Sequence, residues 1–366
     1  MELRKIATDL IKFRTETGNT KDIEACFDYV LSLFGDDIYK KVYKKDKLAP
    51  VMLLSNADTL NFDVLVVGHL DVVPANDEMF EPKFEGNILK GRGALDMKSF
   101  AAVGIKLLEY VEQEKLPLKF GLLFSSDEEK GSFGLAAFLQ EYPELKTKIV
   151  LDVDVAGDIT KIIAKCKNPV FVKLIARGQE AHGSTPWLGI DANEKLLQVW
   201  GNIRKKFAYY SKESTAPANT WINTVHMANI AGGGAVNVIS NNCEAMLDFR
   251  LTEGSSVDEL KKFLESCLID GVKYEIMSSS VPVVMDEKNP YILQYKKLAE
   301  EKLARKIEFE YMGGATDSRE FAQKGSIVIM HSGSGDGMHA ANEYVEWNSV
   351  EALLSVQKDF LRKLAE

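Results

Sequence analysis

Short apolar runs alternate with helix-like segments in the first part of the chain. Residues 64–67, 120–124 and 149–153 are continuous apolar runs, and the first of them is followed by Gly68-His69. Continuous runs of this length are typical of strands buried on both faces of a parallel sheet. Between the first two runs, apolar residues of segment 100–111 fall on one helical face. Strand, helix and strand in this order predict an α/β domain with a mostly parallel sheet.

The pattern changes near residue 168. Residues 170–175 alternate loosely between apolar and polar, and residues 245–251 alternate cleanly, as expected for antiparallel strands with one covered face. Residues 256–259, Ser-Val-Asp-Glu, have the form of a capping box that opens a helix. These features predict an α+β domain with an antiparallel sheet.

A further buried strand of the first type is predicted at residues 326–330. The small domain is therefore expected to be inserted into the large one. We place the large domain at residues 1–167 and 281–366, and the inserted domain at residues 168–280. A length of 366 residues agrees with more than one domain of about 150 residues.

The net charge, the N-terminal pattern and the cysteines limit the classes of protein to which this sequence can belong. Forty-five Lys and Arg residues against 54 Asp and Glu residues give a net charge of −9, which provides no electrostatic reason to bind nucleic acid or an anionic membrane. Charged positions interrupt the apolar stripe of residues 1–13, which predicts an amphipathic helix instead of a signal peptide. The four cysteines are widely spaced and form no CxxC pair. We therefore expect reduced thiols and a cytoplasmic location.

Two of the five histidines follow predicted strands of the large domain. His69 and Asp71 form an H-x-D pair at the end of a buried strand, where the functional groups of α/β sheets gather. Alternation would place both side chains on one side, so Asp71 could orient the imidazole. A structural, hydrogen-bonded histidine is the alternative. His339 follows the last strand and a glycine-rich loop.

Acidic residues gather at corresponding places. They are Asp96 in a glycine-flanked turn, the run Asp127, Glu128 and Glu129 after an apolar strand, and Asp152 and Asp154 within another. Each group alone has an ordinary explanation, namely a helix cap, a solvated loop or a buried paired acid. Together with two histidines they form an oxygen and nitrogen ligand set suited to zinc or a similar divalent ion, with one acid left over as a general base.

Other chemistries find no support. The chain lacks HExxH, GxSxG, P-loop and GxGxxG motifs, so zincin, serine hydrolase, P-loop nucleotidase and dinucleotide-binding interpretations have no support. Lys90 and Arg92 are interpreted as solvated turn charges instead of a phosphate site.

The order of motifs resembles the M20 metallopeptidase family, which includes aminoacylases, acetylornithine deacetylases, succinyl-diaminopimelate desuccinylases and carboxypeptidase G2-like enzymes. The resemblance extends from Val66 to Val345. It is carried by the segments GHLDVVP, GRGALDMK, SSDEEKG, AHGSTPWLG, NVIS, DFR, GGATDSR and HAANEYV.

This resemblance implies a pair of metal sites. His69 and Asp154 would bind one ion, Glu129 and His339 the other, and Asp96 would bridge the two. It also implies a cis peptide bond after Asp96. The third-ligand segment departs from the family pattern; we choose Asp154 because a glycine follows closely, and Asp152 stays open as the alternative.

The resemblance also implies catalytic roles for three residues. Glu128 would be the base that deprotonates water, Asp71 would support His69, and His182 in AHGSTP would stabilise the oxyanion of the tetrahedral intermediate.

Substrate-binding roles are implied for four more residues. Asn237 in NVIS and Arg250 in DFR would hold the substrate carboxylate, and Gly313 and Gly314 would shape the pocket. His226 and His331 match no role and are interpreted as structural.

The predicted function is that of a dinuclear, zinc-dependent amidohydrolase, with cobalt or manganese as alternative metals. It would cleave the amide bond of an N-acyl amino acid or a small peptide with a free carboxylate, and would form a homodimer through the inserted domain. A dipeptidase or tripeptidase on the same scaffold is one alternative. A non-catalytic binding protein derived from such an enzyme is another.

Overall fold

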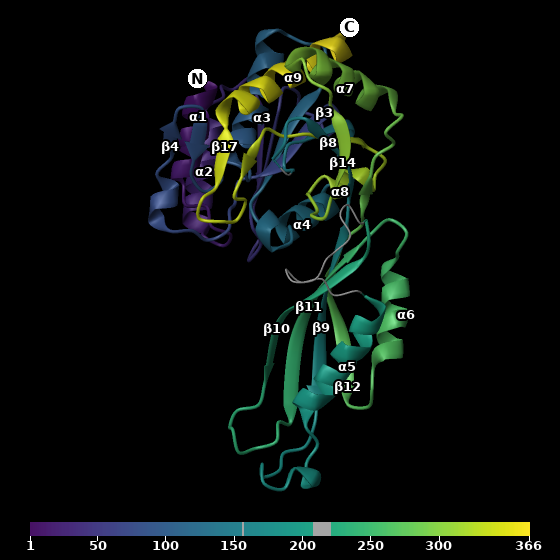
Figure 1. Cartoon of the computed structure of the whole chain (residues 1–366). Helices are drawn as coiled ribbons and strands as arrows, with labels where there is room; N and C mark the ends of the chain where they lie inside the picture. Colours follow the sequence, from purple (N-terminus) through teal and green to yellow (C-terminus); the bar gives the residue numbers. More distant parts are fainter. Residues whose placement is uncertain (156, 208–220) are drawn as a thin grey trace. The chain divides into compact units, whose positions relative to one another are not determined.

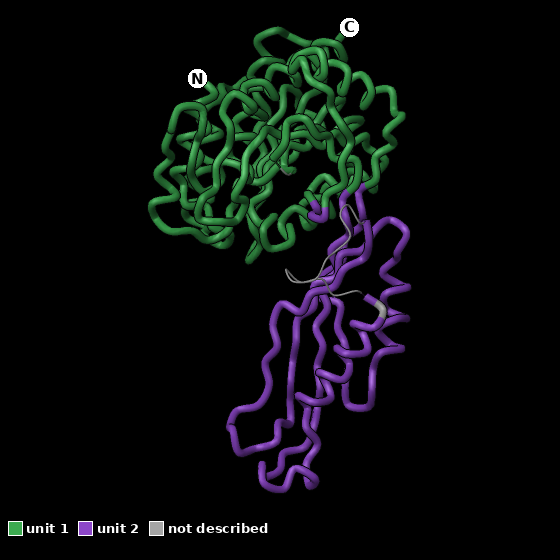
Figure 2. The backbone as a smooth tube through the Cα atoms, viewed as in Figure 1, with its two compact units in different colours: residues 1–165, 284–312, 316–366 green, residues 166–283, 313–315 purple. Residues whose placement is uncertain are grey.

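The chain divides into two units, shown in different colours in Figure 2. A computed structural model describes residues 1–155, 157–207 and 221–366. Unit 1 comprises residues 1–165, 284–312 and 316–366, and unit 2 comprises residues 166–283 and 313–315. The sequence prediction placed the insertion at residues 168–280.

A nine-stranded sheet forms the centre of unit 1 (Figure 1). Its strands are β1 (Tyr39–Tyr43), β2 (Val51–Ser55), β3 (Asn61–His69), β6 (Phe120–Ser125), β7 (Lys146–Asp152), β8 (Lys161–Cys166), β13 (Val283–Val284), β14 (Glu308–Met312) and β15 (Ile327–Met330). The strand order is β1-β2-β6-β3-β7-β15-β8-β13, with β14 also paired to β8. The four central strands β6, β3, β7 and β15 run parallel. The predicted α/β class is confirmed.

Buried apolar side chains explain these central strands. Every residue of β6 is buried, as are the last six residues of β3, which suits strands covered on both faces. The connection from β3 to β6 runs through helix α3 (Lys98–Gln113), and the connection from β6 to β7 runs through helix α4 (Phe133–Glu141). β3 lies between β6 and β7, so the two connections run in opposite directions along the sheet. The right-handed rule for such crossovers then predicts α3 and α4 on opposite faces of the sheet.

Unit 1 contains further helices besides α3 and α4. They are α1 (Leu3–Lys12), α2 (Thr20–Ser32), α7 (Pro290–Leu303), α8 (Arg319–Ala322) and α9 (Trp347–Ala365). The amphipathic helix predicted at the N-terminus is α1, which buries Ile6 and Leu10. Both α1 and α9 contact α3, and α7 contacts α9.

A small second sheet brings two distant segments of unit 1 together. Its strand order is β16 (Gly335–Asp336), β17 (Tyr344–Glu346), β5 (Ile88–Lys90) and β4 (Lys83–Glu85). In the antiparallel ladder between β17 and β5, Tyr344 pairs with Lys90 and Val345 with Leu89. This pairing places the loop before β17 beside the turn after β5.

Unit 2 contains an antiparallel sheet covered by two helices. The strand order is β10 (Thr224–Gly232), β11 (Asn242–Leu251), β9 (Asn168–Arg177) and β12 (Val272–Ser279), and the helices are α5 (Ala192–Lys206) and α6 (Val257–Cys267). Alternate residues of β11 are buried, and Ser256 and Glu259 form the predicted capping box of α6. The predicted antiparallel sheet is confirmed.

Within residues 1–155, 157–207 and 221–366, no helix has both the length and the apolar content needed to cross a membrane.

Candidate metal centre

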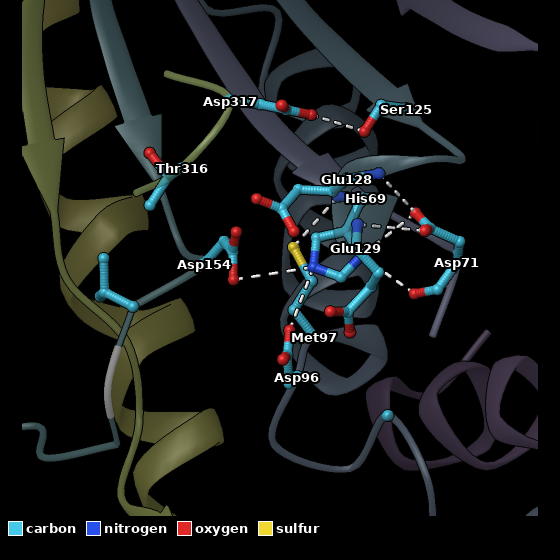
Figure 3. Close-up of polar contacts among 12 residues, drawn as sticks. His69, Asp71, Asp96, Met97, Ser125, Glu128, Glu129, Asp154, Thr316 and Asp317 are labelled. Atoms are coloured by element: carbon cyan, nitrogen blue, oxygen red, sulfur yellow. Dashed lines mark hydrogen bonds and ion pairs between the residues drawn. The ribbon is translucent and has the colours of Figure 1, made fainter. Parts of the chain in front are cut away.

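Three neighbouring parallel strands deliver polar side chains to one edge of the large sheet. His69 is the last residue of β3, Glu128 and Glu129 lie a few residues after β6, and Asp154 lies two residues after β7. Because β6, β3 and β7 are adjacent and parallel, their carboxyl ends meet. Figure 3 shows these side chains converging around the His69 imidazole.

Two groups of potential ligands share one carboxylate. In the first, His69 Nε2 lies 3.0 Å from Asp96 Oδ1 and 3.7 Å from Asp154 Oδ1. In the second, His339 Nε2 lies 3.0 Å from Asp96 Oδ2 and 3.1 Å from Glu129 Oε2. In each group, one potential ligand atom from every member lies within 4.8 Å of the others. The two oxygens of Asp96 therefore face two different histidines, as a bridging carboxylate would.

The His69 ring is oriented by Asp71. The backbone carbonyl of Asp71 accepts a hydrogen bond from Nδ1 at 2.9 Å, which leaves Nε2 directed at Asp96 as a ligand nitrogen. The Asp71 carboxylate also accepts from the backbone N–H groups of Glu128 and Glu129, at 3.1 and 3.3 Å, and from the Thr17 hydroxyl at 2.7 Å. The buried Asp71 thus holds the turn of the two glutamates as well as His69. Sequence reasoning missed this second contact.

The two aspartates at the end of β7 have different partners in the structure. Asp154 belongs to the ligand group, whereas the Asp152 carboxylate accepts from the Asp154 backbone N–H at 2.9 Å and from the hydroxyls of Thr316 and Ser318. Asp152 is fully enclosed by hydrogen-bond donors and supports the backbone of Asp154.

Glu343 holds the turn that carries Asp96. Its Oε1 atom accepts from the backbone N–H groups of Gly93, Leu95 and Asp96, at 3.0, 2.8 and 3.1 Å, and its Oε2 atom accepts from Arg92 at 2.5 Å. The interpretation of Arg92 as a solvated turn charge is wrong: its side chain is buried, because Glu343 provides a buried partner. Lys90 is exposed, as expected.

The segment from His339 to Glu343 therefore positions potential ligands of both groups, because it contains His339 and holds the turn of Asp96. Glu343 lies four residues after His339 and fixes Asp96, while the pairing of β17 with β5 aligns the two segments. The peptide bond between Asp96 and Met97 is cis, as the family resemblance implied. The sequence places Glu343 in the motif HAANEYV. No pattern in the sequence predicts that its carboxylate binds the backbone of Asp96, 247 positions earlier.

Replacement of Glu343 by alanine is expected to lower metal affinity about 10- to 100-fold, because supporting residues of metal ligands typically have effects of this size. Glu343→Gln should have a smaller effect, since its amide oxygen can still accept from the backbone. Metal bound per chain would be measured after equilibration with a competing chelator. Glu300→Ala is the matched control, because Glu300 accepts from a backbone N–H and pairs with a lysine on a surface helix. Equal metal affinity in Glu343→Ala and this control would contradict the role.

The negatively charged carboxylates of this cluster favour positive charge on the groups beside them. Hydrogen bonds to Asp96 and Glu129 raise the pKa of His339 to about 10. Burial lowers the pKa of His69, but Asp154 and the other carboxylates outweigh it and raise that pKa well above its usual value. The carboxylates thus favour the positively charged form of both imidazoles. Divalent ions would supply the same positive charge, so the donor set fits two such ions.

Glu128 lies beside the two groups without belonging to either. In Figure 3 its carboxylate and that of Asp154 point toward one another next to the His69 ring. Burial, followed by repulsion from Asp154, raises the pKa of Glu128 well above its usual value. A raised pKa suits a carboxyl group that must both accept and return a proton.

The two potential ligand groups do not include His331 or His226, the two histidines that match no role in the sequence. His331 is fully buried, where its ring contacts the Tyr295 hydroxyl at 2.9 Å and the Ile159 carbonyl at 2.8 Å. Burial lowers its pKa to about 4, so it is a neutral structural residue. His226 is an exposed residue of β10.

The other predicted site residues belong to unit 2. His182 is exposed and forms an isolated bridge with Val238, next to Asn237, whose carbonyl accepts from the Gly183 N–H at 2.7 Å. Arg250 lies on β11, where its Nε and Nη2 atoms donate to Asp248 at 2.9 and 3.0 Å.

Gly313 and Gly314 lie between β14 and α8 and group with unit 2. A Cβ atom built on Gly313 would meet open space. The role of the two glycines in shaping the pocket stays a prediction.

The sequence of this chain is similar to those of known proteins. Peptidase family M20/M25/M40 matches residues 65–363. Succinyl-diaminopimelate desuccinylase of Helicobacter pylori strain HPAG1 is 27% identical, with 100% of both chains covered.

Solved structures show the same fold. An M20 family metallo-carboxypeptidase from Sulfolobus solfataricus superposes with a TM-score of 0.82 at 16% identity, covering 100% of this chain and 99% of the other. A tripeptidase from Staphylococcus aureus gives a TM-score of 0.77 at 18% identity, with 99% and 98% covered. The resemblance inferred from the motifs is confirmed, and the chain belongs to peptidase family M20/M25/M40, a family of metal-dependent hydrolases.

Proposed function

We propose that this chain is a dinuclear, zinc-dependent amidohydrolase that cleaves the amide bond of an N-acyl amino acid or a small peptide with a free carboxylate. The observation that carries the proposal is the shared carboxylate of Asp96. Its two oxygens face two separate histidines, and Glu128 lies beside them as an additional acid.

His69, Asp96 and Asp154 would hold one ion, and Asp96, Glu129 and His339 the other. When bound, such ions lower the pKa of water toward neutrality and polarise the amide carbonyl. Glu128 takes the proton of the attacking water and returns it to the leaving nitrogen. Asp71 keeps the backbone of Glu128 in place through the hydrogen bond to its N–H group.

His182 is suited to donate a hydrogen bond to an oxyanion. The backbone N–H of Ser184 donates to His182 Nδ1 at 3.1 Å, so in the neutral ring the proton is on Nε2. This exposed N–H is a donor of the kind that stabilises developing negative charge on a carbonyl oxygen.

Arg250 is suited to recognise a carboxylate. Asp248 engages its Nε and Nη2 atoms and so fixes the plane of the guanidinium, while Nη1 takes no part in this pair. A fixed guanidinium gives directional recognition of a substrate carboxylate. The name of the Helicobacter pylori relative, a desuccinylase, supports an acylated amino compound as the substrate class.

The positions of His182 and Arg250 within unit 2 support a homodimer. His182 lies five residues after Arg177, which pairs with Asn242 at the start of β11. Arg250 pairs with Pro169 at the other end of the same ladder between β11 and β9. The eight residue steps from Asn242 to Arg250 span about 27 Å along β11. An acylated amino acid is much shorter than this distance, so one copy of unit 2 cannot place both side chains on one substrate.

We therefore propose that His182 and Asn237 serve the site of a second chain. The two edge strands of the unit 2 sheet, β10 and β12, are available for pairing with that chain. A closed two-fold dimer is the commonest solution for such an interface.

The function is tested by a hydrolysis screen of the purified chain. Metal is removed with a chelator, and zinc, cobalt or manganese is added back. N-succinyl and N-acetyl amino acids, dipeptides and tripeptides are then compared. We expect turnover of acylated substrates that is lost without metal and restored by it. The methyl ester of the best substrate should react poorly because it lacks the carboxylate.

Other outcomes would replace the proposal. Turnover confined to peptides with a free amine would identify a dipeptidase or tripeptidase. No turnover with any metal would favour a non-catalytic binding protein.

A further inference from the structure

The turn that carries Glu128 and Glu129 ends in an unusual backbone conformation. A short 3-10 helix, Glu128–Lys130, is followed by Gly131 with φ +105° and Ser132 with φ +58° and ψ +37°. Glycine adopts positive φ readily, but a serine in the left-handed region is uncommon and must be held by its surroundings.

One buried carboxylate contacts both ends of this turn. Asp317 Oδ2 accepts from the hydroxyl of Ser125, the last residue of β6, at 2.6 Å, and Asp317 Oδ1 accepts from the hydroxyl of Ser132. All three residues are at most 2% exposed. Figure 3 shows the bond between Asp317 and Ser125 next to the turn of Glu128.

Asp317 is itself held by the segment around it. The hydroxyls of its neighbours Thr316 and Ser318 donate to Asp152 at the end of β7. The Arg319 guanidinium donates to the Thr316 carbonyl at 3.0 Å and lies 3.9 Å from Asp317. The segment 316–319 is therefore tied to the end of β7, and Asp317 extends from it to the turn after β6.

We propose that Asp317 is a positioning residue for Glu128 and Glu129. It binds the hydroxyls on both sides of their turn and keeps Ser132 in the left-handed conformation that the turn requires. It belongs to neither of the two potential ligand groups. The proposal rests on the proposed function, because Glu128 is taken as the base and Glu129 as a metal ligand.

The first test is Asp317→Asn, which keeps the size of the side chain but replaces one acceptor oxygen by an NH₂ group. We expect kcat to fall about 10- to 100-fold, as for other residues that support metal ligands, with little change in KM. The absorption spectrum of the cobalt-loaded variant should shift, because the Glu129 carboxylate no longer has a fixed orientation. Asp63→Asn is the matched control: Asp63 also accepts a hydrogen bond at 2.8 Å, from the Lys119 N–H, but lies six residues before His69 on β3.

The second test separates backbone positioning from general loss of stability. Ser132→Ala loses the hydroxyl and keeps a side chain that disfavours positive φ, whereas Ser132→Gly loses the hydroxyl and favours positive φ. We expect Ser132→Gly to be several-fold more active than Ser132→Ala. The double variant Asp317→Asn/Ser132→Gly should be more active than Asp317→Asn alone.

Two results would overturn the inference. One is an Asp317→Asn enzyme with the kcat and cobalt spectrum of the Asp63→Asn control. The other is equal activity of Ser132→Gly and Ser132→Ala in chains with the same melting temperature. Failure of the proposed function would look different, because the wild-type chain would then hydrolyse no substrate, while the cobalt spectrum would still report the effect of Asp317.

Discussion

Glu128→Gln is expected to lower kcat by a factor of about 10² to 10⁴, the usual contribution of a general acid–base group. Glutamine keeps the length and hydrogen-bonding capacity of the side chain but cannot accept a proton. The metal content of the purified variant should stay near that of wild type, because Glu128 belongs to neither ligand group. The backbone N–H that anchors it to Asp71 is also unchanged.

Glu129→Gln is the matched comparison at the adjacent position. Its carboxylate lies 3.1 Å from His339 Nε2 within the second ligand group. We therefore expect loss of about one metal per chain, with activity that recovers in part when excess metal is added. Metal analysis and steady-state kinetics on both variants form the test. If Glu128→Gln lost metal and Glu129→Gln kept it, the roles of the two residues would have to be exchanged.

The sequence predicted the central strands and the residues at their ends because both depend on local patterns. Apolar runs marked β3, β6 and β7, and in a parallel sheet the ends of such strands meet at one edge. The approach of His69 to residues after two other strands follows from that rule alone. The chemistry of the cluster could therefore be expected before any coordinates were known.

The supporting residues could not be predicted in the same way. Glu343 contacts a turn about 250 positions earlier, and Asp317 contacts Ser125 and Ser132, which lie 192 and 185 positions earlier. Such contacts depend on how the second sheet and the segment 316–319 pack, which a single sequence does not encode in any periodic signal. Arg92 is a case in which the local sequence misleads. A charged residue in a glycine-rich turn is usually solvated, but the Arg92 side chain is buried.

The separation of His182 from Arg250 within unit 2 leads to the last expected result. His182→Ala and Glu128→Ala are each expected to be nearly inactive. When the two are mixed under conditions that exchange subunits, a hybrid dimer contains one site with Glu128 from one chain and His182 from the other. Activity should return to about one quarter of wild type, because half of the dimers are hybrids and each has one complete site of two.

The matched control places both changes on one chain. The double variant His182→Ala/Glu128→Ala is mixed with an equal amount of wild type. If each chain completes its partner's site, both sites of a hybrid are damaged, and only wild-type dimers stay active. The activity per total chain should then fall to about one quarter of wild type, whereas a site built from one chain would leave about one half. Subunit exchange would be verified by mass spectrometry of differently tagged chains. Retention of one half in this control, together with inactivity of the first mixture, would place His182 in the site of its own chain.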